Sequence, residues 1–86
     1  MTKDNITFRK ELVSLLPRLR RFAMALAGQR DAAEDLLQSA VERALRKWQL
    51  FDPRGRLDLW MFKIMQNLWI DTRRSAAAEN WVSDQG

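Results

Sequence analysis

Apolar side chains recur at steps of three and four along three stretches of this 86-residue chain, and this spacing predicts helices. The stretches run from about Ile6 to Ala27, from Asp31 to Trp48 and from about Leu57 to Ser75. Each has one apolar face that needs a partner to cover it. The sequence therefore predicts an all-α fold, a compact bundle of three main helices. A short loop, or a short extra helix, precedes the last one.

Local signals mark where these helices bend, stop and start. Pro17 lies inside the first apolar pattern and predicts a kink, because proline removes a backbone donor and clashes with the preceding turn. Gly28 stands where a helix stop is expected. Asp31 is followed three residues later by Glu34, which predicts an acidic capping box at the start of the second helix.

The segment from Phe51 to Arg56 reads as a turn by composition. Pro53 fixes its own backbone angle, and Gly55 can take a positive φ. Aromatic residues, among them Trp48 and Trp60, flank the turn. Rings beside cations can hold unstacked bases, yet tryptophan in a small domain is usually a core residue, and we favour the core for Trp60 and Trp69.

Composition limits what the chain can do. It has no cysteine and no histidine, so thiol ligands and the usual proton shuttle are missing, and we expect neither an enzyme nor a bound cofactor. Apolar runs fall short of a membrane span, and the N-terminus has no signal-peptide core, so we expect a cytoplasmic protein without membrane insertion. A net charge of +4 favours a polyanionic partner, nucleic acid first and anionic lipid second.

Acidic residues line the second helix. A metal cluster of Asp31, Glu34, Asp35 and Glu42 lacks a matching set of ligands elsewhere, so a solvated helix face is the better interpretation. Asp35, Gln38 and Glu42 lie on successive turns and could also pair with a basic helix of a partner.

The third helix carries cations and amides on one narrow ridge, namely Lys63, Gln66, Asn67, Arg73 and Arg74. Amides can read base edges and cations can bind phosphates, whereas the alternative is an ordinary polar face of a bundle. Arg54 and Arg56 precede the same helix and favour nucleic acid. The turn residues are the better candidates for touching a flipped base.

Four segments in this order resemble region 2 of the extracytoplasmic-function group of bacterial sigma factors, over roughly Leu12 to Arg74. They are LRRFAMALAG, DAAEDLLQ leading into ALRKW, the tripeptide FDP, and FKIMQNLWIDTRR. The resemblance implies a transcription initiation factor. Its second helix would bind the coiled coil of the β′ subunit of core RNA polymerase, and its third helix would recognise and melt the promoter minus-ten element. The intervening loop would capture a base flipped from the non-template strand.

The resemblance also implies roles for individual residues. The polymerase-binding set would be Asp35, Leu36, Gln38, Ser39 and Glu42. The DNA-binding set would be Arg54, Gly55, Arg56, Lys63, Gln66, Asn67, Arg73 and Arg74. Within the second set Asn67 is the candidate base reader. One departure from the family pattern is Ser39, which stands where an acidic residue is usual, and the lost charge would weaken docking to polymerase.

We expect the chain to divide into a helical domain over residues 1–75 and the start of an interdomain linker over 76–86, as in a fragment of a longer protein. Other functions stay open at this point. A sigma-mimicking domain that binds an anti-sigma factor would look alike, and an anti-sigma factor is also a possible partner of a working sigma domain. A basic amphipathic bundle could instead bind an anionic membrane surface, without regard to DNA sequence.

Overall fold

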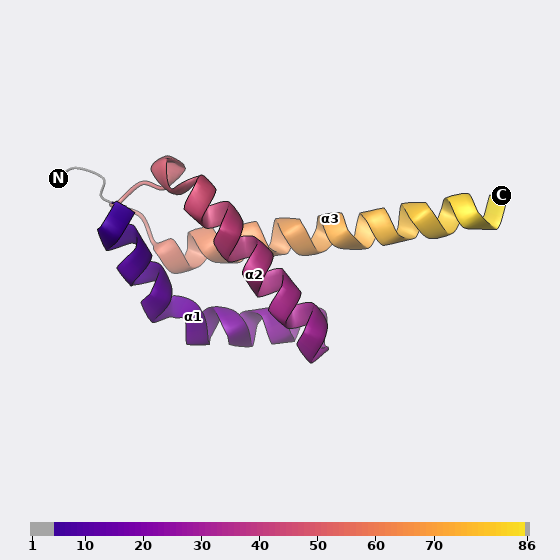
Figure 1. Cartoon of the computed structure of the whole chain (residues 1–86), viewed down its shortest axis with the longest axis horizontal. Helices are drawn as coiled ribbons and strands as arrows, with labels where there is room; N and C mark the ends of the chain where they lie inside the picture. The colour runs from indigo at the N-terminus through magenta and orange to yellow at the C-terminus, as the bar shows by residue number, and fades with distance from the viewer. Residues whose placement is uncertain (1–4, 86) are drawn as a thin grey trace.

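The structure of the chain is a computed structural model that describes the backbone of residues 5–85 and the side chains of residues 5–74. The elements follow in the order α1 (Asn5–Ala27), α2 (Arg30–Arg46), a single 3-10 turn η1 (Trp48–Leu50) and α3 (Leu57–Gln85). No strand occurs among the described residues. The all-α prediction and the short extra helix before the last one are confirmed (Figure 1).

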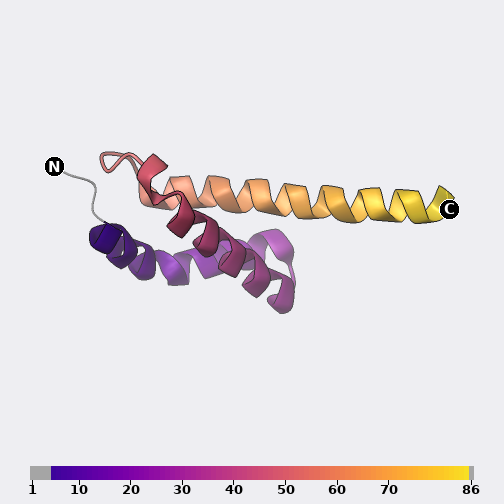
Figure 2. The ribbon, with the colours of Figure 1, turned by 45° about the horizontal axis from the view of Figure 1, so that its top comes forward.

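Each of the three long helices packs against the other two. The chain reverses direction between α1 and α2, and α2 crosses α3 obliquely (Figure 1). In both views the C-terminal part of α3 projects beyond the ends of α1 and α2 (Figure 2). Helix α1 bends near its middle, where the predicted kink residue Pro17 lies inside the helix.

The core lies where the three helices meet and is built from large side chains set against small ones. Ala23, Ala40 and Ala44 are completely buried, and their short side chains let the helix axes approach closely. Leu19, Met61 and Met65 are the largest side chains that are fully buried, and they fill the space between the helices. The other buried apolar residues are Phe8, Leu12, Ala33, Leu36, Leu37, Phe51 and Leu57.

Helix α1 ends where the sequence predicts, at a glycine with left-handed backbone. Gly28 has φ of 71°, and its N–H donates to the carbonyl of Met24 over 2.8 Å. A residue with a side chain would be strained in this conformation, so glycine is the natural stop signal.

Helix α2 starts one residue before the expected position, and the predicted capping box is wrong. Gln29 is the cap residue and makes no side-chain capping bond, while the N–H of Ala33 donates to the Gln29 carbonyl. Asp31 therefore lies inside the first turn, where its charge still suits the helix dipole. Glu34 pairs with Arg20 of α1 instead, at 3.1 Å.

Helix α3 extends to Gln85, well beyond the expected end near Ser75. The residues after Ser75 begin with three alanines, and neither proline nor glycine follows before Gly86, so nothing in the sequence stops the helix. Residues 76–85 thus have helical backbone rather than the irregular structure expected of a tail. Their assignment to an interdomain linker stays a prediction.

The loop between η1 and α3 rests on a cluster of aromatic rings. Phe51 is buried, and its ring centroid lies 5.9 Å from that of Phe8 and 5.3 Å from that of Trp60. The Phe8 ring also contacts Trp48, at 6.5 Å. The rings therefore pack on one another and support the loop from below, instead of standing open for stacking on bases.

Gly55 leaves room for a close approach of the backbone in this turn. Among the described residues only Gly28 has positive φ, so Gly55 does not use the positive φ that a glycine can take. A Cβ atom at Gly55 would lie 3.2 Å from the carbonyl oxygen of Asp52, which accepts a 2.8 Å bond from the Gly55 N–H. A side chain at position 55 would require the Asp52 carbonyl to shift by a few tenths of an ångström.

A buried carboxylate joins the loop to two helices. Asp58 lies in the first turn of α3, is 6% exposed, and accepts hydrogen bonds from Arg56 over 2.7 Å and from Arg18 of α1 over 3.1 Å. It also accepts the backbone N–H of Leu59 over 2.9 Å. The hydrogen bond from Arg56, that from Leu59 and the positive charges of Arg56 and Arg18 hold the pKa of the Asp58 carboxyl below its ordinary value of 3.8.

We expect Asp58→Asn to lower the melting temperature at pH 7 by several degrees, because Arg18 and Arg56 lose their common counter-charge. A lowered pKa in the folded state means that the carboxylate stabilises the fold fully above pH 4–5, and that this stabilisation disappears as the pH falls through the lowered value. The difference between wild type and variant should therefore shrink below about pH 4 in thermal unfolding followed by circular dichroism.

Asp71→Asn serves as the control, since Asp71 lies on the same helix but is exposed. It should change the melting temperature little at any pH. A deficit of Asp58→Asn that stays constant from pH 7 to pH 3 would contradict the assignment.

Candidate functional site

The outward side of α3 carries all five residues of the predicted ridge. Lys63, Gln66, Asn67, Arg73 and Arg74 are each exposed. They face away from Met61 and Met65, which are completely buried on the core side of the same helix. The helix therefore presents two amides and three cations to solvent on one surface, which we call the α3 ridge.

The cations of the α3 ridge are free to bind an anion. Among residues 5–74, no carboxylate lies within 4.0 Å of the charged groups of Lys63, Arg73 or Arg74. Asp71 is exposed at the edge of this surface. A row of uncompensated positive charges on one helix face is what a phosphate backbone neutralises.

The loop arginines differ from those of the ridge, because each already has an acidic partner. Arg54 contacts Asp52 at 3.5 Å, with the two side chains 90% and 58% exposed, and such a pair contributes little. Arg56 is held at 2.7 Å by the buried Asp58. Its Nε and one terminal nitrogen donate hydrogen bonds to Asp58. This holds the guanidinium group in place and leaves its other donors available to a ligand.

The sequence reading missed Asp58 as a part of this site. A carboxylate two residues after an arginine, in the first turn of a helix, could have suggested a local pair. Its second partner, Arg18, lies 40 residues away in the sequence, and only the packing of α1 against α3 brings it near.

The exposed face of α2 carries four of the five residues of the predicted polymerase-binding set. Asp35, Gln38, Ser39 and Glu42 are exposed on successive turns of the helix. Neither Asp35 nor Glu42 has a cation within 4.0 Å among the described residues. We call this surface the α2 face.

Leu36 does not belong to the α2 face. It is 5% exposed and forms part of the core, and it lines the groove between α2 and α3, so its role in binding polymerase stays a prediction. Its burial follows from its position on the apolar stripe, one step from Leu37, which is buried to the same extent.

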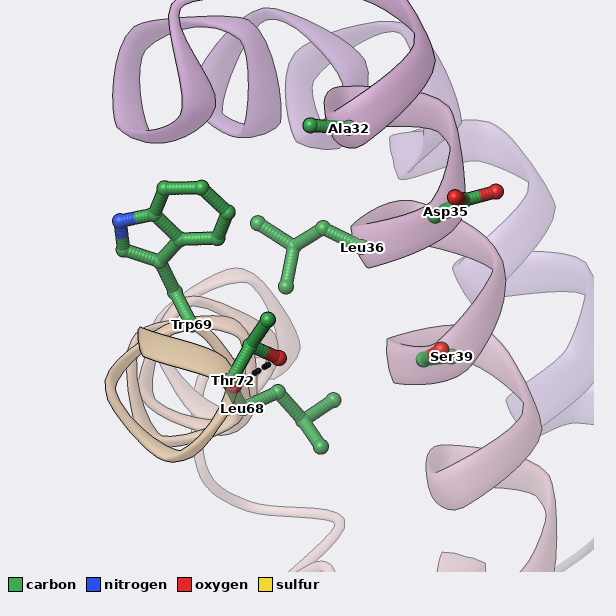
Figure 3. Close-up of a pocket in the computed structure, with 7 residues that line it drawn as sticks. All are labelled: Ala32, Asp35, Leu36, Ser39, Leu68, Trp69 and Thr72. Atoms are coloured by element: carbon green, nitrogen blue, oxygen red, sulfur yellow. Dashed lines mark hydrogen bonds between the residues drawn. The ribbon is translucent and has the colours of Figure 1, made fainter. Parts of the chain in front are cut away.

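Two grooves flank the α2 face. The first lies between α2 and α3 and has a volume of about 180 Å³. Leu36 and Trp69 point toward each other across it, Asp35 points away from it, and Ser39 lies at its edge (Figure 3). On the α3 side the Thr72 hydroxyl is engaged with the carbonyl of Leu68, at 2.9 Å, so this groove offers mainly apolar surface.

The second groove lies between α1 and α2 and has a volume of about 280 Å³. Leu16 and Val41 form its apolar part, while Gln38, Glu42 and the Arg20–Glu34 pair lie along its edges. An exposed acidic helix face between two apolar grooves is suited to docking of a partner helix, which could bury side chains on either side.

The described residues contain no group of three or more acidic, histidine or cysteine side chains that could hold a metal ion. None of the helices in this part of the chain has an apolar stretch long enough to traverse a bilayer. The features that the structure brings together are thus a basic ridge, a braced loop and an acidic face, all exposed on one small bundle.

A model of the sigma2 domain of PhyR matches residues 12–66 of this chain, which include α2, the loop and the first third of α3. The matched span is more than half of the 86 residues. It contains the whole α2 face and the loop with Asp58.

Curated relatives and a solved structure agree with this match. The chain is 36% identical to the ECF RNA polymerase sigma factor EcfG of Rhodopseudomonas palustris over 73 residues, covering 85% of this chain and 40% of that protein. It is 38% identical to the ECF RNA polymerase sigma factor SigL of Mycobacterium tuberculosis over 66 residues, covering 72% and 36%.

The solved structure is that of the sigma factor RpoE in complex with the anti-sigma factor NepR from Bartonella quintana. It superposes with a TM-score of 0.84 at 35% identity and covers 93% of this chain and 50% of that one. The chain thus spans half or less of the length of each of these relatives. The acidic α2, the arginine loop and the basic α3 all lie within a fold that these relatives share. The chain therefore belongs to the sigma2 family, as region 2 of an extracytoplasmic-function sigma factor.

Proposed function

We propose that this chain works in the cytoplasm as the part of a bacterial sigma factor that binds core RNA polymerase and melts the promoter minus-ten element. The α2 face would bind the β′ coiled coil, and the loop and α3 ridge would bind the non-template strand. The observation that carries the proposal is the α3 ridge, where two amides lie among three cations that have no acidic partner among residues 5–74.

The polymerase-binding part rests on the charge and shape of the α2 face. Asp35 and Glu42 supply negative charge, and Gln38 supplies a hydrogen-bonding amide between them. Such a surface would select a basic partner helix and fix its register, while the neighbouring grooves would receive apolar side chains. Ser39, at the edge of the first groove, contributes no charge.

The DNA part needs no covalent chemistry. A surface that binds unpaired bases more tightly than paired ones shifts the opening equilibrium of the duplex toward the melted state. Lys63, Arg73 and Arg74 would supply sequence-independent, salt-dependent affinity, and Asn67 would supply preference among bases. A flipped base would be received at residues 54–56. There the backbone N–H groups of Arg54 and Gly55 donate to Asp52, and the Arg56 side chain donates to Asp58.

An anti-sigma factor is a second candidate partner. The favouring observation is the Bartonella quintana structure, in which the similar sigma factor is bound to the anti-sigma factor NepR. The α2 face and its grooves would serve this partner as well as polymerase. A sigma-mimicking domain would use only this surface and would have no need of the α3 ridge.

The polymerase-binding role predicts that Gln38→Ala weakens binding of the chain to core RNA polymerase, or to its isolated β′ coiled coil, by at least about fivefold. Ser39→Glu should tighten the same complex, because it adds a charge beside Asp35 on an exposed face. Fluorescence anisotropy or biolayer interferometry would measure both.

Leu50→Ala is the matched control, since Leu50 is 72% exposed and lies outside the α2 face. If neither the folded wild-type chain nor the Ser39→Glu variant bound polymerase, while the chain bound an anti-sigma factor, the mimic would replace the proposed function.

The DNA-binding role predicts different effects for two neighbouring residues of the α3 ridge. With the chain bound to core polymerase, selection from randomised single-stranded oligonucleotides should show that Asn67→Ala relaxes base preference at one position, by about 1–3 kcal/mol. Arg74→Ala should weaken binding to all sequences alike and reduce the slope of log affinity against log salt by about 1.

Arg21→Ala removes the same charge from an exposed position on α1 and controls for net charge. Equal effects of Asn67→Ala and Arg74→Ala on every oligonucleotide would refute the division of roles.

A further inference from the structure

Two large apolar side chains are exposed among the cations of the α3 ridge. Leu59 is 54% exposed and Ile70 is 46% exposed, and the described part of α3 has no other large apolar residue that is exposed. Single exposed leucines need no explanation in general. These two stand out because of what surrounds them.

Helix geometry places both residues inside the ridge. At 100° per residue, Leu59 and Ile70 lie within about 20° of each other around the α3 axis. Lys63 lies about 40° from Leu59 on one side, and Gln66 about 20° from it on the other. The exposed order along the helix is thus apolar, cation, amide, apolar, with Arg73 and Arg74 beyond.

The distance between Leu59 and Ile70 along the helix matches the length of a few nucleotides of a DNA strand. They are separated by 11 residues, or about 16.5 Å along the helix. At 3.4 Å per stacked nucleotide this is about five steps of one DNA strand. Leu59 is the residue nearer the loop, and its backbone N–H is fixed by the Asp58 carboxylate.

Building on the proposed function, we propose that Leu59 and Ile70 contact the 5-methyl groups of two thymines in the melted promoter strand and make the chain prefer thymine at these positions. The methyl group is the apolar feature that distinguishes thymine among the bases, and exposed aliphatic side chains are suited to contact it. The cations around them would hold the phosphates of the same strand.

The surroundings favour DNA over a protein partner on this surface. Lys63, Arg73 and Arg74 give it one predominant sign of charge, which suits a polyanion. Neither Leu59 nor Ile70 lines either of the two grooves that flank the α2 face. A thymine methyl group requires only an apolar contact on the surface.

The test removes one methyl group at a time from the DNA. The chain is bound to core polymerase, its preferred single-stranded oligonucleotide is selected from a random pool, and each thymine in it is replaced by uracil. For the wild type we expect about a fourfold loss of affinity at two thymines, the factor that corresponds to burial of one methyl group. Leu59→Ala should abolish the loss at one of them, and Ile70→Ala the loss at the other.

Val13→Ala is the control, because Val13 is 63% exposed on α1, outside the ridge, and this variant should keep both thymine preferences. Equal affinity of the wild type for thymine and uracil at every position would overturn the inference. A thymine preference that survives in both variants would also overturn it. The same holds if both variants bind DNA normally but lose a protein partner.

These outcomes differ from a failure of the proposed function. If base preference depends on Asn67 while thymine and uracil bind alike, only the inference about Leu59 and Ile70 falls. If the folded chain with polymerase binds no single-stranded DNA, both the function and the inference fall.

Discussion

The buried carboxylate of Asp58 is the interaction on which the arrangement of the site depends. A charge removed from water must be compensated, and here two guanidinium groups and one backbone N–H provide the compensation. Arg18 belongs to α1, Arg56 to the loop, and Asp58 itself to α3. One side chain therefore fixes where α3 begins, how the loop leaves it, and where both lie relative to α1.

The packing of the three helices allows this small bundle to present two separate surfaces. The core is made of Ala, Leu and Met side chains that bring three helices into mutual contact. The α2 face and the α3 ridge both point outward from it, on different helices and with opposite charge. A partner on one surface need not displace a partner on the other, as the proposed binding of polymerase and DNA together would require.

The sequence predicted well what periodicity and composition determine. Three helices, the stop at Gly28, the exposed α2 face and the exposed α3 ridge all follow from apolar spacing and from the placement of charge. Among the local motifs, the kink at Pro17 and the stop at Gly28 are confirmed. The capping box is wrong, because the helix starts at Arg30 and Gln29 is its cap residue.

The features that could not be predicted from the sequence depend on contacts between residues that lie far apart along the chain. The partnership of Arg18 with Asp58 requires knowledge of how α1 packs on α3, and so does the enclosure of Phe51 by Phe8. Leu36 is buried, as its position on the apolar stripe of α2 predicts. Helix α3 is longer than its apolar pattern predicts. The pattern stops near Ser75, but the alanines that follow favour continuation of the helix.

Site-specific crosslinking in one complex can test whether the α2 face binds polymerase while the α3 ridge binds the melted strand. A photoreactive p-benzoylphenylalanine would replace Gln66 in one sample and Gln38 in another, each assembled with core polymerase and DNA whose minus-ten region is unpaired. We expect the probe at position 66 to crosslink to the non-template strand and the probe at position 38 to crosslink to the β′ subunit. A probe at position 66 that reaches only protein, or one at position 38 that reaches DNA, would contradict this assignment of the two surfaces.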